Sequence, residues 1–332
     1  MRTNLIRIVG VAALRTGTIA AALFFGISQA SAQEYPQRPV TLVAPQAVGG
    51  AADLAARAFA HVAERYLGQP IRVVNTAGGA GVPGMMSVAT AEADGYTLLA
   101  PMAPFAVSGP VFREENPYKT FDFDYLAILE EQPLVIAVPS SSNIADAQAL
   151  VDELRSGDAN LKIAVGSKIS LATLVFRALS LDTGAGPEAM TAIPYKSGPD
   201  SVRGLLAGDV GAASINLSSI NAALRSGDAR LLMVSTANRN EAYPDAATAA
   251  ELGLETVDGI TLWIGLAGPK GLPDEVKAKW ATVLDQVFSD PEYTDLVKQR
   301  GSAVANLVGA DAVSTIKGQL ETFETLKAAL SN

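Results

Sequence analysis

Residues 40–54 read VTLVAPQAVGGAADL, and residues 71–99 repeat the same order of patterns. Each begins with an apolar run of strand length, continues with a glycine-containing loop and leads into a helical stripe. The first helix is expected from Asp53 to a stop at Gly68, and the second over residues 84–93. Strand, glycine loop, helix and strand in this order predict a parallel α/β sheet.

The rest of the chain continues this alternation. Further helices are expected to end at Leu154, after N-cap candidates at 140–143, and to lie at 171–181, 199–207 and 219–225. Further strands are expected at 96–99, 134–138, 161–165, 190–194, 210–215, 231–235 and 260–267. Only helical patterns follow Pro273. We predict an α/β fold of two lobes, with the end of the chain free to return to the first lobe.

Composition excludes several classes of protein. The 332 residues suffice for about two domains, and their hydrophobic content of 49% excludes intrinsic disorder. The absence of cysteine excludes a disulfide framework, a thiolate zinc site and a Cys nucleophile. A single histidine, His61, leaves no partner for a His-rich metal centre, and the net charge of -9 argues against a nucleic-acid face. We therefore expect no metal, no cofactor and no nucleic-acid partner.

The first 32 residues have the order of a secretory signal. Three arginines precede an uncharged run over residues 16–32, which ends in Ala30, Ser31 and Ala32. Its apolar core is shorter than the ~20 residues that span a membrane, so a membrane anchor is the less favoured reading. We expect export to the periplasm, with cleavage after Ala32 and a mature chain that begins near Gln33.

The two glycine loops predict an anion site. Residues 79–84, GAGVPG, match the dinucleotide pattern G-x-G-x-x-G, but Pro83 occupies the turn and no carboxylate follows the next strand. A more general reading remains, because a glycine loop at a helix N-terminus presents free N–H groups and a positive dipole end. Loops after neighbouring parallel strands would aim these donors at one carboxylate. The alternative is that the glycines only form tight turns, and Asp53 is expected to hold its loop as a helix N-terminal residue.

Signatures of catalysis are mostly absent. Residues 314–317, STIK, match S-x-x-K without the companion motifs S-D-N and K-T-G, so a solvated helix is favoured. G-x-S-x-G and H-E-x-x-H do not occur. His61 lies on an alanine-rich helix, where a structural role is favoured over a catalytic one, and Trp263 is expected in the core.

An ordered set of motifs carries a family resemblance. They are YPQRPV (35–40), GGAAD (49–53), NTAGGAGVPG (75–84), DGYTLL (94–99), PYKSGP (194–199), LLAGDV (205–210) and WIGL (263–266). Together they resemble the substrate-binding proteins of tripartite tricarboxylate transporters, the Bug receptor family. The resemblance covers essentially the whole chain after the signal.

The resemblance implies a type II periplasmic-binding-protein-like fold, in which each lobe is a mostly parallel sheet flanked by helices. Lobe 1 would comprise residues 33–134 and 258–332, lobe 2 would comprise residues 135–257, and the lobes would close on a small carboxylate. The ligand-binding residues carried over are Gly49, Gly50, Ala51 and Asp53 in the first loop, Gly78, Gly79, Ala80 and Gly81 in the second loop, and Ser170, Ser214 and Asn216 in the facing lobe.

Three departures from the family pattern concern the ligand. Residues 45–48, PQAV, replace a proline-rich lead-in, and residues 166–170, GSKIS, lack the usual glycines. Ile215 stands where an Asp is common, which predicts a ligand without a cationic amino group. Lys168 either adds a positive charge to the site or is solvated, and the solvated reading is favoured.

The function that we expect is that of a periplasmic, non-enzymatic solute-binding protein. It would capture a small organic carboxylate and deliver it to the membrane permease subunits of a tripartite tricarboxylate-type transporter, and we expect a monomer. The alternative is an exported α/β enzyme that acts on a carboxylate or phosphate substrate held by the glycine loops. A receptor that signals to a sensor kinase is a third reading.

Overall fold

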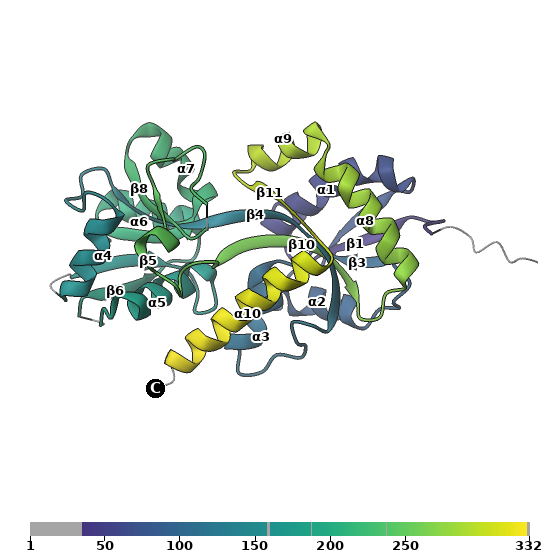
Figure 1. Cartoon of the computed structure of the whole chain (residues 1–332), viewed down its shortest axis with the longest axis horizontal. Coiled ribbons are helices and arrows are strands. Elements are labelled where there is room, and N and C mark those ends of the chain that lie inside the picture. The colour runs from purple at the N-terminus through teal and green to yellow at the C-terminus, as the bar shows by residue number, and fades with distance from the viewer. Residues whose placement is uncertain (1–34, 158–159, 187, 237, 331–332) are drawn as a thin grey trace, which may run out of the picture. The chain divides into compact units, whose positions relative to one another are not determined.

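One long strand, β4 (Phe123–Pro139), connects two half-sheets. The computed structural model describes residues 35–157, 160–186, 188–236 and 238–330, and its strands form one sheet of 11 strands. Up to Pro133, β4 pairs with one set of strands, and from Leu134 it pairs with another. Figure 1 shows β4 running from one group of helices and strands into the other.

The first half-sheet has the order β2-β1-β3-β10-β4, with β11 on the other edge of β4. Strands β1 to β4 share one direction, and β10 and β11 run against them. The members other than β4 are β1 (Val40–Ala44), β2 (Ile71–Asn75), β3 (Thr97–Leu99), β10 (Thr261–Pro269) and β11 (Ala303–Val308).

Helices cover both faces of the first half-sheet. Along β1, Leu42 joins one hydrophobic cluster and Val43 joins another, because successive side chains of a strand point to opposite faces. On the Leu42 face lie α1 (Ala51–Leu67), α8 (Asp274–Phe288) and α9 (Pro291–Gln299). On the Val43 face lie α2 (Val82–Ala89), the π-helical turn η2 (Pro104–Ser108), α3 (Gly109–Phe112) and α10 (Ala310–Leu330).

The second half-sheet comprises the end of β4 and five further strands. They are β5 (Leu161–Val165), β6 (Met190–Pro194), β7 (Ala212–Asn216), β8 (Ala229–Val234) and β9 (Ala247–Thr248). All five run in one direction, antiparallel to β4. The helical elements of this half are α4 (Ala147–Ser156), α5 (Leu171–Thr183), α6 (Gly198–Ala207), α7 (Leu217–Ser226) and the short η3 (Ala250–Leu252).

The expected α/β class with two mostly parallel half-sheets is confirmed, and three local expectations are wrong. Strand β4 begins at Phe123 rather than at Leu134, so that it crosses between the half-sheets. Helix α4 is capped by Asp146, whose side chain accepts a hydrogen bond from Ala149 N, and not by residues 140–143. The region after Pro273 is not wholly helical, because β11 pairs with β4 there.

Trp263 is part of the core, as expected. Its indole is buried in β10, and its Nε1 donates to Oε1 of Gln319 at 2.9 Å. The Nε2 of the same glutamine donates to the carbonyl of Thr261 at 3.0 Å. The buried carboxamide of Gln319 in α10 therefore accepts one hydrogen bond from β10 and donates another to it, which holds the helix against the strand.

Candidate functional site

The first glycine loop is held by Asp53. The Oδ2 of this side chain accepts from Gly49 N at 2.8 Å, and its Oδ1 accepts from Nε of Arg57 at 2.8 Å and from Nδ2 of Asn75 at 2.9 Å. Burial at 1% exposure would raise the pKa of Asp53, but the hydrogen bonds from Arg57, Gly49 and Asn75 outweigh it and lower the pKa. Both carboxylate oxygens are occupied by the protein, so Asp53 shapes the loop.

The N-terminus of α1 is capped from outside the helix. Gly50 is the N-cap residue and has no side chain, and Oε1 of Gln46 accepts from Ala52 N at 2.9 Å instead. A Cβ on Gly50 would lie 2.7 Å from that oxygen, although the backbone of Gly50, at φ -73°, would admit any residue. A side chain on Gly50 would therefore crowd the Gln46 carboxamide and also the carbonyl of Ala47, which would lie 3.1 Å from the added Cβ. Ala51 is the first residue of the helix.

The second glycine loop has four consecutive residues with positive φ angles. The φ angles are 98° at Gly78, 51° at Gly79, 49° at Ala80 and 85° at Gly81. Ala80 carries a Cβ there, which costs roughly 1–2 kcal/mol. Strained residues of this kind collect at functional sites, because the surrounding structure has to hold them. The loop ends in the 3-10 turn η1 (Gly79–Gly81), directly before α2.

The segment from η2 to α3 supports this second loop. A Cβ on Gly81 would lie 2.6 Å from the ring of Phe105, so only glycine permits that ring to rest on the loop. Nη2 of Arg113 donates to the carbonyl of Ala80 at 2.7 Å. The hydroxyl of Tyr118 donates to the carbonyl of Phe105 at 2.9 Å and fixes η2 in turn.

The two glycine loops lie together at the carboxyl ends of β1 and β2. Nδ2 of Asn75, the last residue of β2, donates to the carbonyl of Gln46 at 3.0 Å. A Cβ on Gly84, in α2, would lie 2.8 Å from Cα of Pro45. The residues after β1 therefore pack directly on the helix that follows the second loop, as the parallel pairing of β1 and β2 requires.

Two of the three candidate residues of the second half-sheet have structural partners. Ser170 is the N-cap of α5, and its Oγ accepts from Thr173 N at 3.2 Å. Ser214, at 1% exposure, donates from Oγ to the carbonyl of Ala172 at 2.7 Å. Asn216 ends β7 and is the N-cap residue of α7, where its side chain makes no capping hydrogen bond. Asn216 is therefore the candidate whose amide is not used to cap its helix.

One short segment joins the candidate residues of the two halves. Within η2, Phe105 rests on Gly81 of the second glycine loop, as described above. Three residues later, the buried Ser108 donates from Oγ to the carbonyl of Ile169 at 3.0 Å, directly before Ser170. The second glycine loop and the N-terminus of α5 therefore flank the same π-helical turn, a feature found frequently at functional sites.

Ile215 lies in the apolar core of the second half. It is 3% exposed and belongs to a hydrophobic cluster of the second half with Val135 and Leu217. Successive residues of β7 point to opposite faces, so Ile215 faces away from the side of Ser214 and Asn216. The prediction of a ligand without an ammonium group no longer follows from this residue. Lys168 is exposed in the loop before α5.

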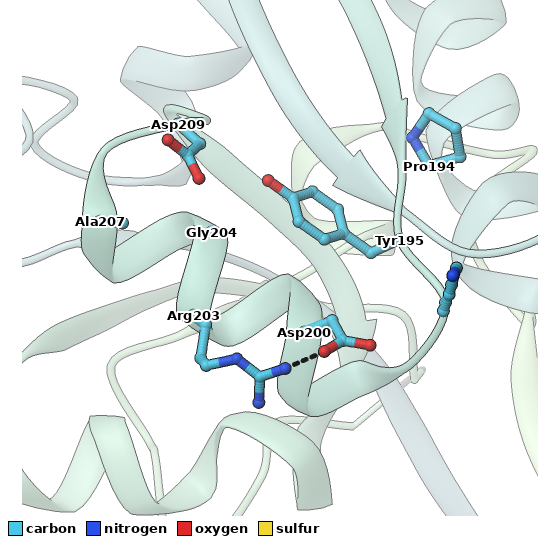
Figure 2. Close-up of a pocket in the computed structure, with 8 residues that line it drawn as sticks. Pro194, Tyr195, Asp200, Arg203, Gly204, Ala207 and Asp209 are labelled. Atoms are coloured by element: carbon cyan, nitrogen blue, oxygen red, sulfur yellow. Dashed lines mark hydrogen bonds and ion pairs between the residues drawn. The ribbon is translucent and has the colours of Figure 1, made fainter.

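Two open hollows lie elsewhere on the surface. One, of about 360 Å³, lies between α1 and α9 and is lined by Arg57 and His61, among others. The other, of about 500 Å³, lies on α6. Figure 2 shows Tyr195 projecting across it toward Gly204, where a Cβ would lie within 3 Å of the phenol. Neither hollow is lined by a residue of the glycine loops or by Ser170, Ser214 or Asn216.

His61 and Lys317, the two residues considered for catalysis, each pair with a glutamate on a helix surface. His61 is 66% exposed, and its Nε2 lies 2.8 Å from Oε1 of Glu292, so that it links α1 to α9. Lys317 lies 3.7 Å from Glu321 on an exposed face of α10. Between residues 35 and 330, apart from the four undescribed positions, no three His, Asp or Glu side chains are grouped to hold a metal ion.

The predicted signal segment lies outside the described residues, as does the expected cleavage after Ala32. Within the part of the chain that the structure describes, no helix has the length and apolar character needed to cross a membrane.

Sequence reasoning missed four residues that shape the candidate site. They are Gln46, Asn75, Phe105 and Arg113. Asn75 stands inside a quoted family motif, which was a signal for it. Gln46 lies in the departure from the family pattern at residues 45–48, and it contacts Ala52 in the adjoining helix. Phe105 and Arg113 act through contacts with the second glycine loop, from which they are distant in the sequence, and no local pattern marks them.

Comparison with known proteins agrees with the resemblance. The family model for the tripartite tricarboxylate transporter family receptor, TctC, matches residues 55–330. The chain is 32% identical to Protein BugT of Bordetella pertussis over 277 residues, which cover 82% of this chain and 81% of BugT.

Solved structures share the fold. A TctC solute-binding protein from Polaromonas, solved without ligand, superposes with a TM-score of 0.77 at 21% identity, over 90% of this chain and 99% of that protein. MatC from Rhodopseudomonas palustris, solved with bound malate, gives a TM-score of 0.69 at 23% identity, over 88% of this chain and 100% of MatC. The family match and the shared fold lead to one conclusion: this chain belongs to the tripartite tricarboxylate transporter receptor family.

Proposed function

We propose that the protein is an exported, non-enzymatic receptor that binds a small organic carboxylate and delivers it to the permease of a tripartite tricarboxylate-type transporter. Family membership and the malate bound to MatC support the ligand class. The signal pattern of the first 32 residues supports export to the periplasm. N-terminal sequencing of protein from the periplasm should begin at Gln33, and an intact N-terminus would contradict processing after Ala32.

One observation carries the proposal: two glycine loops meet at the carboxyl ends of parallel strands, and η2 links them to the N-terminus of α5. Gly49 N, Gly50 N and Ala52 N already donate to protein acceptors. The carboxylate would therefore meet the other N–H groups at the start of α1 and those at the start of α2, where each helix N-terminus has a positive dipole end. Each such donor contributes roughly 0.3–2 kcal/mol, and micromolar affinity needs about -8 kcal/mol, so several donors must act together.

The proposed ligand-binding set follows from this arrangement. The two glycine loops would supply backbone donors, and Asn216 would supply a side-chain amide from the opposite half. Asp53, Ser170 and Ser214 would act by holding these groups in place, because their own oxygens already have protein partners.

The proposed lobes are residues 33–134 with 258–332, and residues 135–257. The change of partners along β4 supports this division, since Pro133 pairs with Thr261 of β10 whereas Leu134 pairs with Asn216 of β7. Closure of the two lobes about this junction would enclose the ligand. A decrease in the radius of gyration in solution scattering with saturating ligand is expected, and an unchanged radius would contradict closure.

A thermal-shift screen of malate, succinate, adipate and aromatic acids tests the ligand class. A ligand present at ~100 times its Kd should add about 2.7 kcal/mol of stability. Isothermal titration would then give the affinity of each positive compound. The absence of any carboxylate that stabilises the protein would refute the proposed function.

Two positions on β7 allow ligand binding to be tested separately from structural support of the site. Ser214 and Asn216 lie on the same face of the strand, but only Ser214 is tied to α5. Asn216→Ala should weaken binding of the identified carboxylate at least fivefold and leave the Tm unchanged, since an amide contact is worth about 1 kcal/mol. Ser214→Ala should lower the Tm instead. Equal affinity in wild type and Asn216→Ala would remove Asn216 from the site.

The rival functions have direct tests. An enzyme would alter the carboxylate that it binds, whereas a receptor returns it unchanged, which mass spectrometry of the released ligand decides. Co-purification with membrane permease subunits supports delivery to a transporter. Co-purification with a sensor kinase alone would favour a signalling receptor.

A further inference from the structure

The junction of the two half-sheets lies at a single point on β4. Thr261 of β10 is opposite Pro133, the next residue Leu134 is opposite Asn216 of β7, and Ala303 of β11 is opposite Glu131. Proline has no backbone N–H, so β4 lacks a donor at the position where its partners change. Hydrogen bonds that involve the side chains of Gln132 and Ser235 lie beside this position.

Gln132 supplies these bonds on one edge of β4. The antiparallel registers, extended by one or two residues, bring Ser302 and Ser218 to this glutamine from the two halves. Its Nε2 donates to Oγ of Ser302 at 2.8 Å, and its Oε1 accepts from Oγ of Ser218 at 3.1 Å. Gln132 is 7% exposed, and a Cβ added at Gly301 would lie 3.5 Å from Cβ of Ser218, so the two halves come close together here.

The other edge of β4 is closed by a buried serine. Leu134 N donates to Oγ of Ser235 at 3.1 Å, and Ser235 N donates back to the carbonyl of Leu134 at 2.9 Å. Gly259 N, just before β10, donates to the carbonyl of Ser235 at 3.2 Å. On this edge the links to Ser235 are backbone-centred, so Gln132 is the side chain that ties a hydroxyl of one half to a hydroxyl of the other.

We propose that Gln132 is a positioning residue that sets the resting angle between the two halves and thereby the place of Asn216. Ser218 stands two residues after Asn216 in the first turn of α7, so the bond from Ser218 to Gln132 holds the start of this helix. This inference rests on the proposed function, because Asn216 acts there as a ligand contact. A looser junction lowers the fraction of molecules that have Asn216 in place. The apparent Kd rises by the factor by which this fraction falls.

The absence of cysteine allows a direct measurement of the angle. Spin labels at Ala207→Cys in α6 and Ala278→Cys in α8, both exposed, report the distribution of distances between the halves without ligand. Gln132→Met keeps the length of the side chain and removes its hydrogen bonds. Gln148→Met is the matched control, because Gln148 is an exposed glutamine of α4 that bonds only to its neighbour Asp152.

A milder pair of variants protects the test against misfolding. Ser218→Ala removes only the hydroxyl that reaches Gln132, and Ser218→Thr keeps it. We expect the distance distribution to broaden in Gln132→Met and Ser218→Ala and to stay as in wild type in Ser218→Thr and Gln148→Met. Unchanged distributions in both of the first two variants, or equal broadening in the alanine and threonine variants, would overturn the proposal. If Gln132→Met does not fold, the Ser218 pair decides.

Titration with malate, succinate and adipate completes the experiment. Ser218→Ala should weaken binding of the carboxylate that wild type binds by about fivefold, the equivalent of about 1 kcal/mol. Wild-type affinity in a variant with a broadened distribution would overturn the positioning role. If wild type binds none of the three acids, the proposed function fails for these ligands, whereas the distance measurement still decides whether Gln132 sets the angle.

Discussion

The carboxamide of Gln46 and the missing side chain of Gly50 make a paired prediction about the start of α1. Oε1 of Gln46 lies 2.9 Å from Ala52 N, and a Cβ on Gly50 would lie 2.7 Å from the same oxygen. Gly50→Ala therefore pushes the carboxamide away from the N–H group that it caps. Gln46→Ala removes that carboxamide outright.

Each substitution alone should lose the same cap. A helix N-cap is worth about 1 kcal/mol, which corresponds to roughly 1–2 °C in Tm for a chain of ~300 residues. In the double variant the cap can be lost only once. Gln46→Ala with Gly50→Ala should therefore be more stable than the sum of the two single effects predicts, by about 1 kcal/mol.

Urea unfolding of the wild type, the two single variants and the double variant gives the four free energies of unfolding of this double-mutant cycle. Gly49 provides a matched control, since a Cβ at this neighbouring glycine would meet nothing within 4 Å. Gly49→Ala carries the strain of φ +81° but should add to Gln46→Ala without coupling. Additivity of the Gly50 and Gln46 effects to within ~0.5 kcal/mol would refute the assignment of Gln46 as the cap of α1.

Three further predictions concern the surroundings of the site. Asp53→Asn should lower the free energy of unfolding by about 1–3 kcal/mol at pH 7. The pKa of Asp53 is lowered in the folded state, so its contribution to stability is present above pH ~4 and is lost as pH falls through that pKa. The urea midpoints of wild type and variant should therefore converge in acid. Gly81→Ala should cost about 2 kcal/mol through its positive φ and the ring of Phe105, and a cost that persists undiminished in a Phe105→Leu background would contradict the contact. Arg300→Leu should cost about 3 kcal/mol at pH 7, since it leaves Glu130 buried without its partner; burial raises the pKa of Glu130 despite Arg300, so the variant should regain stability as pH is lowered toward 5, and a pH-independent loss would refute this account.

The regular elements could be predicted because each carries its own local signal. Strand β1, with the sequence VTLVA, and strand β5 were expected with their observed bounds. Helix α1 ends at Leu67 with Gly68 in a left-handed C-cap, as its glycine stop predicted. Apolar periodicity and glycine stops are properties of short segments, so they survive without knowledge of tertiary contacts.

The first part of β4 and the whole of β11 could not be predicted, because tertiary contacts create them. The first part of β4 includes Glu130, Glu131 and Gln132, whose polarity argues against a buried strand. Glu130 is accommodated by an ion pair with Arg300, a partner 170 residues away in the sequence. Strand β11 is mostly half-buried or exposed and has Asn306 at φ 49°, so it lacks both an apolar run and a regular alternation.

In the candidate site, too, some features are visible in short segments of sequence and others depend on tertiary contacts. Glycine loops and helix N-termini are local features, and the sequence located them. Whether a polar side chain near them is free or already bonded depends on its neighbours in space. Asp53 was expected to hold its loop, and its carboxylate does hold Gly49. Ser214 was expected at the ligand, and its hydroxyl is bonded to α5.

In a receptor of this kind, side chains that hold the binding loops in place favour ligand binding. Backbone N–H groups at helix N-termini have no rotamers to order on binding, so they hold a carboxylate at low entropic cost, provided that the loops are already fixed. In this chain Asp53 and Asn75 fix the first loop, and Phe105 and Arg113 fix the second. The side chains around the site therefore determine where the backbone donors point, and the identity of the ligand depends on the few groups, such as Asn216, that the fold leaves without such a task.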